Sequence, residues 1–202
     1  VNLIPRFFDV TEGRILVDGV DIRQMPLHEL RERIGYVPQK GVLFSGTIDS
    51  NIRYGKEAAT EAEVQRAAEI AQAWDFIEEK EDGVQSAIAQ GGTNVSGGQK
   101  QRLSIARAIA KNPEIYIFDD SFSALDYKTD VVLRRALKKE TKDATTLIVA
   151  QRISTILHAD KILVLDEGHV VGQGTHKELL KSCDVYRQIA MSQLSEEELA
   201  DE

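Results

Sequence analysis

The sequence contains one cysteine, Cys183, among its 202 residues, so no disulfide can form within the chain. A lone thiol suits a reducing compartment, and we expect an inert side chain that is buried or half-buried. No apolar run approaches the roughly 20 residues that a membrane-spanning helix requires. We therefore expect any membrane attachment to come from elsewhere.

Positive charge is outnumbered by negative charge, and histidine is scarce. The 25 lysines and arginines are outnumbered by 33 aspartates and glutamates, which gives a net charge of -8. This balance argues against a nucleic-acid-binding surface, and we expect no nucleic acid partner. Of the four histidines, His28, His158 and His169 lack the spacing of metal ligands, and we expect His176 to be a surface residue.

A phosphate-binding loop of the form Gly-x-x-x-x-Gly-Lys-Ser/Thr is missing from these residues. Gly41 and Gly46 have the required spacing, but Thr47 stands where the lysine would meet the phosphates. Any nucleotide chemistry must therefore be inferred from other motifs.

One such motif is a serine and two glycines placed where a helix is expected to begin. Leu103, Ala106 and Ile109 recur at helical spacing after it. Helix N-termini accept anions, and glycine lets the backbone approach a ligand closely. Ser-Gly-Gly alone is more often an ordinary loop, but the helical continuation favours an anion-binding helix start. The residues of this motif are Ser96, Gly97, Gly98 and Gln99.

A second motif is an apolar strand, residues 115–118, that runs into Asp119 and Asp120. An apolar run that ends in acid is also a common way for a buried parallel strand to reach the surface. Here the strand follows the glycine motif by about twenty residues and precedes a loop, Ser121–Asp126.

This order of motifs resembles the nucleotide-binding domain of an ABC transporter of the multidrug-type exporter branch. The resemblance implies an α/β fold with a P-loop NTPase-type ABC ATPase core, in which a mostly parallel sheet has flanking helices, an antiparallel β piece and a helical subdomain. The chain, residues 1–202, would divide into a partial core with the β piece (1–46), the helical subdomain (47–111) and the remaining core (112–202).

The resemblance also assigns site residues, with ATP and Mg²⁺ as cofactors. Asp119 would hold Mg²⁺, since this hard cation takes oxygen ligands. Gln39, which follows the strand Ile34–Val37, would contact Mg²⁺ or the attacking water. Asp126 would lie at the nucleotide and signal across a dimer interface.

Two positions depart from the family pattern. Asp120 stands where a catalytic glutamate is usual, and Gln151 replaces a histidine that contacts the γ-phosphate. Aspartate is one methylene shorter, and glutamine cannot carry a charge. The combination resembles the slow-hydrolysing half of a heterodimeric exporter, whose Ser96–Gln99 motif would complete the site of a second half-transporter subunit.

The segment Val42–Ile48 resembles the exporter version of the loop after Gln39. It would face a coupling helix of the transmembrane domain of the same parent chain, at the cytoplasmic face of the cell membrane. A core contact is the simpler explanation for Leu43 and Phe44.

By the same resemblance, Val1–Ile4 would lie just beyond the missing phosphate loop. We therefore expect an N-terminally truncated piece that binds ATP weakly or not at all and is inactive alone. Two other functions stay open: a soluble ABC ATPase in DNA repair or translation, and a non-catalytic interaction module.

Local patterns predict the remaining elements. Asp18-Gly19 predicts a hairpin over residues 14–22, and Thr60 with Glu63 predicts a capped helix over 61–73. Trp74, Phe76 and Ile77 are expected in the core. Further expectations are a helix over 128–140, buried strands over 145–150 and 161–166, a strand over 169–173, a helix capped by Thr175, and a frayed acidic end over 195–202.

Overall fold

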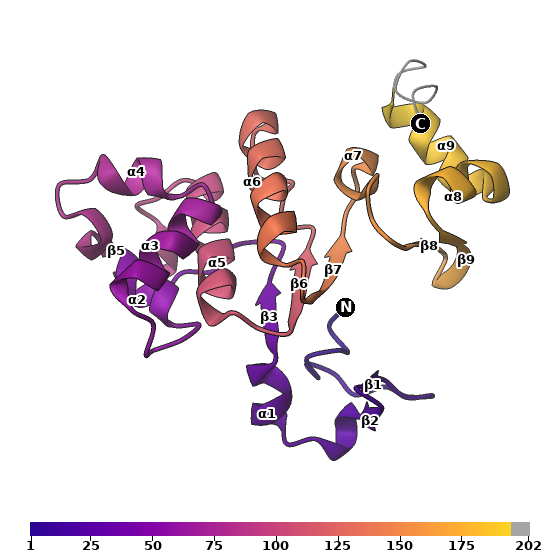
Figure 1. The fold of residues 1–202 in the computed structure, drawn as a ribbon, viewed down its shortest axis with the longest axis horizontal. Helices are drawn as coiled ribbons and strands as arrows, with labels where there is room; N and C mark the ends of the chain where they lie inside the picture. The colour runs from indigo at the N-terminus through magenta and orange to yellow at the C-terminus, as the bar shows by residue number, and fades with distance from the viewer. Residues whose placement is uncertain (195–202) are drawn as a thin grey trace. The chain divides into compact units, whose positions relative to one another are not determined.

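The computed structural model describes residues 1–194 (Figure 1). The chain divides into two compact units, residues 1–149 and the residues from Ala150 onward. The acidic end at 195–202 lies outside the described residues, as does the prediction that it frays. Within the described part, no helix is both long and apolar enough to cross a bilayer.

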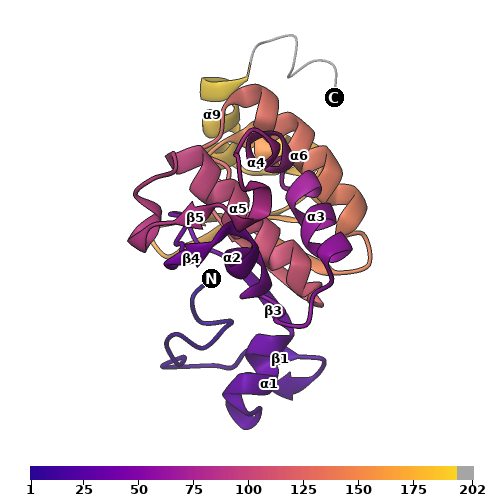
Figure 2. The same cartoon turned by 90° about the vertical axis from the view of Figure 1, so that its left-hand side faces the viewer.

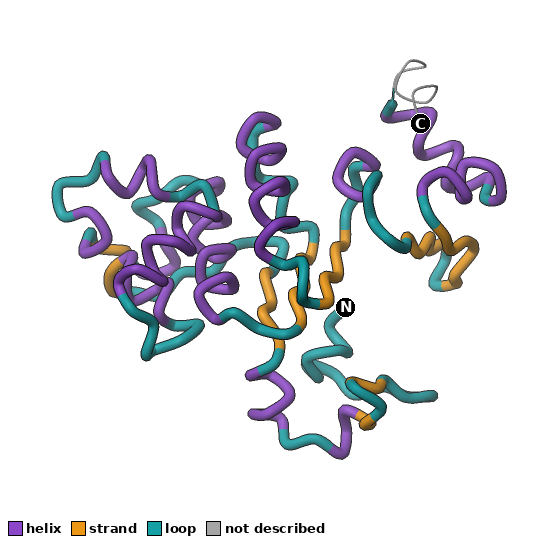
Figure 3. The backbone as a smooth tube through the Cα atoms, in the orientation of Figure 1, coloured by secondary structure: helices purple, strands orange, loops and turns teal. Residues whose placement is uncertain are grey.

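A three-stranded parallel sheet forms the centre of the first unit (Figure 3). Its order is β3 (Ile34–Val37), β6 (Ile115–Asp119) and β7 (Thr145–Val149). The register places Val37 beside Phe118, and Asp119 beside Val149. Because the strands are parallel, their carboxyl ends lie at one edge, where the predicted acidic residues emerge.

Several helices of the first unit (Figure 2) pack around a hydrophobic core that also includes Val37, Tyr116 and Phe118 of the sheet. They are α2 (Ile48–Arg53), α3 (Glu61–Ile70), α4 (Trp74–Glu78) and α5 (Gly97–Lys111), with the short strands β4 (Gly46–Thr47) and β5 (Ala87–Ile88) paired beside them. The Thr60 and Glu63 capping box begins α3 as predicted, but the helix ends at Ile70 because Gln72 is left-handed at φ 56°. Phe76 and Ile77 are buried.

Helix α6 (Tyr127–Glu140) connects β6 to β7, as a parallel pair requires. The predicted hairpin is present in a shorter form, as β1 (Leu16–Val17) and β2 (Val20–Asp21). Asp18 and Gly19 both have positive φ, 50° and 79°, which is the conformation of a tight hairpin turn. Helix α1 (Leu27–Glu32) then leads into β3.

The second unit contains α7 (Ile153–Ile156), the antiparallel pair β8 (Ile162–Asp166) and β9 (His169–Gly174), α8 (His176–Ser182) and α9 (Asp184–Gln193). Thr175 caps α8 as predicted. Cys183 is buried in the small core of this unit, so the expectation of a buried thiol is confirmed.

Two predicted buried strands are substantially exposed. Ile148 and Val149 of β7 are 36% and 38% exposed, and Leu163 and Leu165 of β8 are 56% and 67% exposed. Apolar composition favours burial, but burial requires a covering element. Among the described residues, β7 pairs only with β6 and β8 pairs only with β9.

His176 was predicted at the surface, and this prediction is wrong. Its side chain is buried, and its Nδ1 lies 2.7 Å from the hydroxyl of Tyr186. Tyr186 lies on α9, so packing between α8 and α9 determines the position of His176.

Candidate functional site

Side chains from two strand ends meet beside the sheet of the first unit. Asp119 is the last residue of β6, and its Oδ2 accepts a 2.9 Å hydrogen bond from the Tyr36 hydroxyl. Gln39 follows β3, and its Nε2 donates to Asp120 Oδ2 over 3.1 Å. The parallel register therefore brings together three predicted site residues, Gln39, Asp119 and Asp120.

The backbone of Asp120 is tightly constrained. Its φ is 47°, in the left-handed region that aspartate tolerates better than most residues. Its N–H donates to the Val149 carbonyl over 3.0 Å, and its own carbonyl accepts from Ser123 Oγ over 2.9 Å. The residue is only 9% exposed, so its short carboxylate is held close to the end of β6.

Tyr36 is a site residue that the sequence did not reveal. It is half-buried, and burial followed by the hydrogen bond to Asp119 raises the pKa of Tyr36 to about 12. At neutral pH the phenol therefore keeps its proton and donates a hydrogen bond to Asp119. The only signal in the sequence is a hydroxyl within an apolar strand, three residues before Gln39, and nothing local identifies its partner.

The serine and glycine motif begins α5, as predicted. Ser96 Oγ accepts from the N–H of Gln99 over 3.2 Å, and the Gln99 side chain accepts from Ser96 N over 3.0 Å. Ser96 and Gly97 are exposed. Apart from its chain neighbours and the backbone of its own helix, no described atom lies within 4 Å of the place a Cβ on Gly97 would take. A Cβ on Gly98 would meet only the Ala124 carbonyl, at 3.6 Å. The start of α5 is therefore open to a ligand from outside.

Two buried polar side chains join this helix and the acidic strand to the end of β3. Gln101 is 1% exposed and donates from Nε2 to the Pro38 carbonyl over 3.0 Å. Ser121 is fully buried and donates to the Val37 carbonyl over 2.8 Å. Both bonds fix the backbone immediately before Gln39. The sequence signal for Gln101 is its helical spacing: it lies three and four positions before Ser104 and Ile105, on the face of α5 that is buried.

The two other predicted site residues lie at the start of α6 and in the second unit. Asp126 is exposed and caps α6, and hydrogen bonds from Thr129 hold the pKa of Asp126 below its usual value. Gln151 belongs to the second unit, where its carbonyl accepts from Gln193 Nε2 over 2.9 Å. The cluster described in the first unit contains Gln39, Asp119 and Asp120.

An exposed aromatic surface, defined here as Val42, Phe44 and Tyr54, lies beside α5. These side chains are 52%, 45% and 68% exposed, and the rings of Phe44 and Tyr54 are 4.6 Å apart. The Arg107 guanidinium lies 5.3 Å from the first ring and 5.5 Å from the second. Leu43 is buried in the core, as expected. The expected core contact is wrong for Phe44, whose side chain is exposed.

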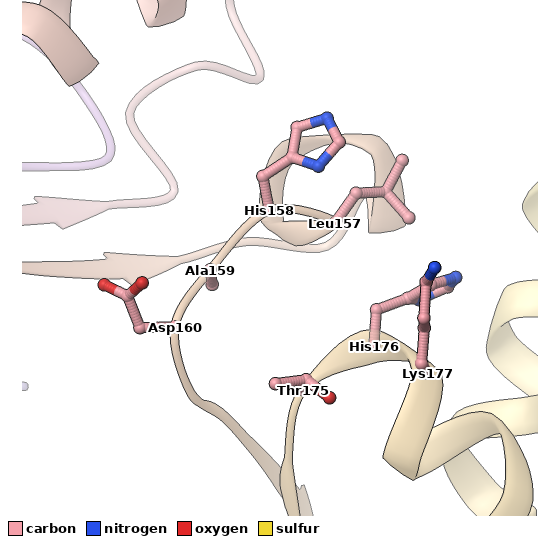
Figure 4. Close-up of a pocket in the computed structure, with 7 residues that line it drawn as sticks. All are labelled: Leu157, His158, Ala159, Asp160, Thr175, His176 and Lys177. Atoms are coloured by element: carbon pink, nitrogen blue, oxygen red, sulfur yellow. The ribbon is translucent and has the colours of Figure 1, made fainter. Parts of the chain in front are cut away.

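The second unit contains a cavity of about 640 Å³ between the loop after α7 and the start of α8 (Figure 4). Leu157 and His158 line one side, and His176 and Lys177 line the other, while the Asp160 carboxylate points away from both. None of the predicted site residues lines this cavity.

Comparisons with known proteins agree with the arrangement in the first unit. The family model described as ABC transporter matches residues 1–123. The chain belongs to the ABC transporter family.

An uncharacterized ABC transporter ATP-binding protein of Mycobacterium bovis is 48% identical over 196 residues, which cover 96% of this chain and 33% of the relative. A Staphylococcus aureus protein, whose name describes multidrug export and an ATP-binding/permease protein, is 48% identical over 189 residues, which cover 94% of this chain and 33% of the relative. The chain thus spans about a third of the length of these ABC transporter relatives.

This chain is also similar to a solved structure, that of a bacterial Atm1-family ABC exporter with ATP bound. The match covers 96% of this chain and 34% of the exporter chain. The TM-score is 0.93 and the identity is 42%. The expected fold, an α/β ABC ATPase with a parallel sheet and antiparallel strands, is confirmed.

Proposed function

We propose that this chain is the ATP-binding and ATP-hydrolysing domain of an ABC exporter, and that it couples both steps to export across a membrane. The observation that carries the proposal is the convergence of Gln39, Asp119 and Asp120 at the ends of β3 and β6. The open helix start at Ser96 supplies a second, separate surface that suits phosphate.

The residues at the strand ends fit a magnesium ion and a nucleotide. Two carboxylates and a side-chain amide offer the oxygen ligands that Mg²⁺ prefers, and bound Mg²⁺ would neutralise charge on the phosphates. Asp119 would hold the ion with help from Gln39. Ser96, Gly97, Gly98 and Gln99 would contact the ATP of a second subunit, and Asp126 would lie near the interface between the two.

We further propose that this chain is the slow half of a heterodimer. The Asp120 carboxylate is held near the strand end by its buried backbone and by Gln39. A carboxylate shorter by one methylene stops on the order of 1 Å short of a water in line with the γ-phosphate, and such a displacement can cost about 100-fold in rate. Gln151 can donate a hydrogen bond to the phosphate but cannot bring a positive charge.

The proposed partners are a second half-transporter subunit and the transmembrane domain of the same polypeptide. The Staphylococcus aureus relative is an ATP-binding/permease protein with about two thirds of its length outside this match. The aromatic surface of Val42, Phe44 and Tyr54 is the apolar area that would receive such a domain, at the cytoplasmic face of the membrane.

The test uses the full-length polypeptide that contains this sequence, purified with its partner subunit. The partner's own catalytic site is disabled, so that the remaining ATPase activity belongs to the site of this chain. The double variant Asp120→Glu with Gln151→His should raise that activity by about 100-fold, as expected when a carboxylate misplaced by one methylene is restored.

The matched control makes the same two exchanges at exposed positions, Asp143→Glu and Gln65→His, and should leave the rate unchanged. An unchanged rate in the first double variant would favour a non-catalytic role for this chain. Efficient turnover by a purified homodimer of the unmodified polypeptide would contradict the slow half directly.

A further inference from the structure

The hydrogen bond between Tyr36 and Asp119 has no assigned role in the reaction. Tyr36 lies on β3, Asp119 ends the neighbouring strand β6, and the hydroxyl meets Oδ2 over 2.9 Å. The hydroxyl also lies 3.0 Å from Asn2 Oδ1. A phenol has one proton, and of two acceptors the charged carboxylate forms the stronger bond.

The position of the Tyr36 ring is well defined. The Phe7 ring meets it edge to face, with centroids 5.3 Å apart and planes at 89°. The guanidinium of Arg31 lies 5.6 Å from the centroid of Phe7 and donates from Nε to the Pro5 carbonyl over 3.0 Å. The phenol therefore reaches Asp119 from a ring that is itself fixed by packing.

A carboxylate that occupies one oxygen with a fixed donor can turn only slightly about its last bond. Its other oxygen then points in a constant direction, which is the condition for binding an ion of strict geometry such as Mg²⁺. Partners of metal ligands commonly act in this way, and their removal typically costs 10-fold to 100-fold in metal affinity.

We propose that Tyr36 is a positioning residue for magnesium: its hydroxyl holds Asp119 Oδ2 so that Oδ1 is presented to the ion. This inference rests on the proposed function, because it requires that Asp119 bind Mg²⁺. Tyr36 itself contacts neither the ion nor the nucleotide in this role.

The experiment measures ATP retained by the full-length polypeptide and its partner subunit, at a temperature low enough to stop hydrolysis, as Mg²⁺ is titrated. The Asp119→Asn variant defines the part of the magnesium-dependent signal that belongs to this site. For that part, Tyr36→Phe should raise the half-saturating Mg²⁺ concentration about tenfold, the effect typical of lost partners of metal ligands. ATP retained in excess chelator should be unchanged.

Two comparisons separate positioning from a general loss of structure. Tyr127→Phe removes a hydroxyl from a side chain that is 75% exposed and should titrate like the unmodified protein. Phe7→Leu keeps the Tyr36 hydroxyl but loosens its ring, so it should give a smaller rise than Tyr36→Phe. Tyr36→Phe should also keep the thermal unfolding midpoint of the unmodified protein.

The outcomes are distinguishable. If Asp119→Asn removes the magnesium-dependent signal and Tyr36→Phe titrates like the unmodified protein, the role of Tyr36 is wrong and the proposed function stands. If Asp119→Asn retains the whole signal, the magnesium site of the proposed function is wrong, and the role of Tyr36 is wrong with it.

Discussion

Strands β6 and β7 are neighbours in one parallel sheet, have similar apolar sequences and differ sharply in burial. Tyr116, Ile117 and Phe118 in β6 are at most 1% exposed, whereas Ile148 and Val149 in β7 are more than a third exposed. The difference lies in what surrounds each strand. β6 has a strand on both sides. Among the described residues β3 and β7 each have a strand on one side only, but α1 and α5 pack against β3, which is buried.

This contrast matters for the site because β6 carries Asp119 and leads to Asp120. Both neighbouring strands form hydrogen bonds with these two residues: the Tyr36 hydroxyl of β3 donates to Asp119, and the Val149 carbonyl of β7 accepts from the N–H of Asp120. The acidic pair is therefore positioned by the sheet itself. Gln151, by contrast, follows the less covered strand.

Phe118→Ala in the 202-residue chain should lower the free energy of unfolding more than any other variant that tests this comparison. Phe118 is 1% exposed and packs against Tyr116 and Phe122, with ring centroids 6.0 Å and 5.3 Å away. Truncation should lower the free energy of unfolding by about 3–5 kcal/mol, the usual cost of a large cavity in a core. Urea denaturation would measure it, and a cost below that of Ile148→Ala would break the comparison.

Ser121→Ala should have an intermediate effect on the free energy of unfolding. Its buried hydroxyl donates to the Val37 carbonyl at the end of β3, and without it that carbonyl loses this donor. The expected loss is about 1–3 kcal/mol, the penalty for an unsatisfied buried polar group. Ser123→Ala is the matched control, because its hydroxyl bonds to the Asp120 carbonyl from an exposed residue and should cost less.

Ile148→Ala should have the smallest effect on the free energy of unfolding. Ile148 lies directly beside Phe118 in the sheet. Because Ile148 is 36% exposed, the loss should be about 1–2 kcal/mol, below the range for a fully buried isoleucine. The same urea measurement applies. If the cost in the full-length polypeptide rises to that of a core residue, segments beyond this sequence cover β7 there.

Elements defined by local chemistry could be predicted from the sequence. The caps at Thr60 and Ser96, the turn at Asp18-Gly19 and the acid-ended strand at Asp119 depend on residues close together in the chain. The exposure of β7 and of Phe44, and the burial of His176, depend instead on which distant element covers them. Tyr36 belongs to the second group, since its partner is 83 residues away and only the register of β3 and β6 brings them together.

The unpaired side of β7 also has a consequence for handling the protein. Among the described residues, its outer N–H and C=O groups meet no neighbouring strand, and Ile148 and Val149 lie exposed along it. Edges of this kind recruit strands from other molecules, and natural proteins interrupt them with lysine or proline. The 202 residues prepared alone should therefore self-associate as their concentration rises, and Val149→Lys should keep them soluble for longer.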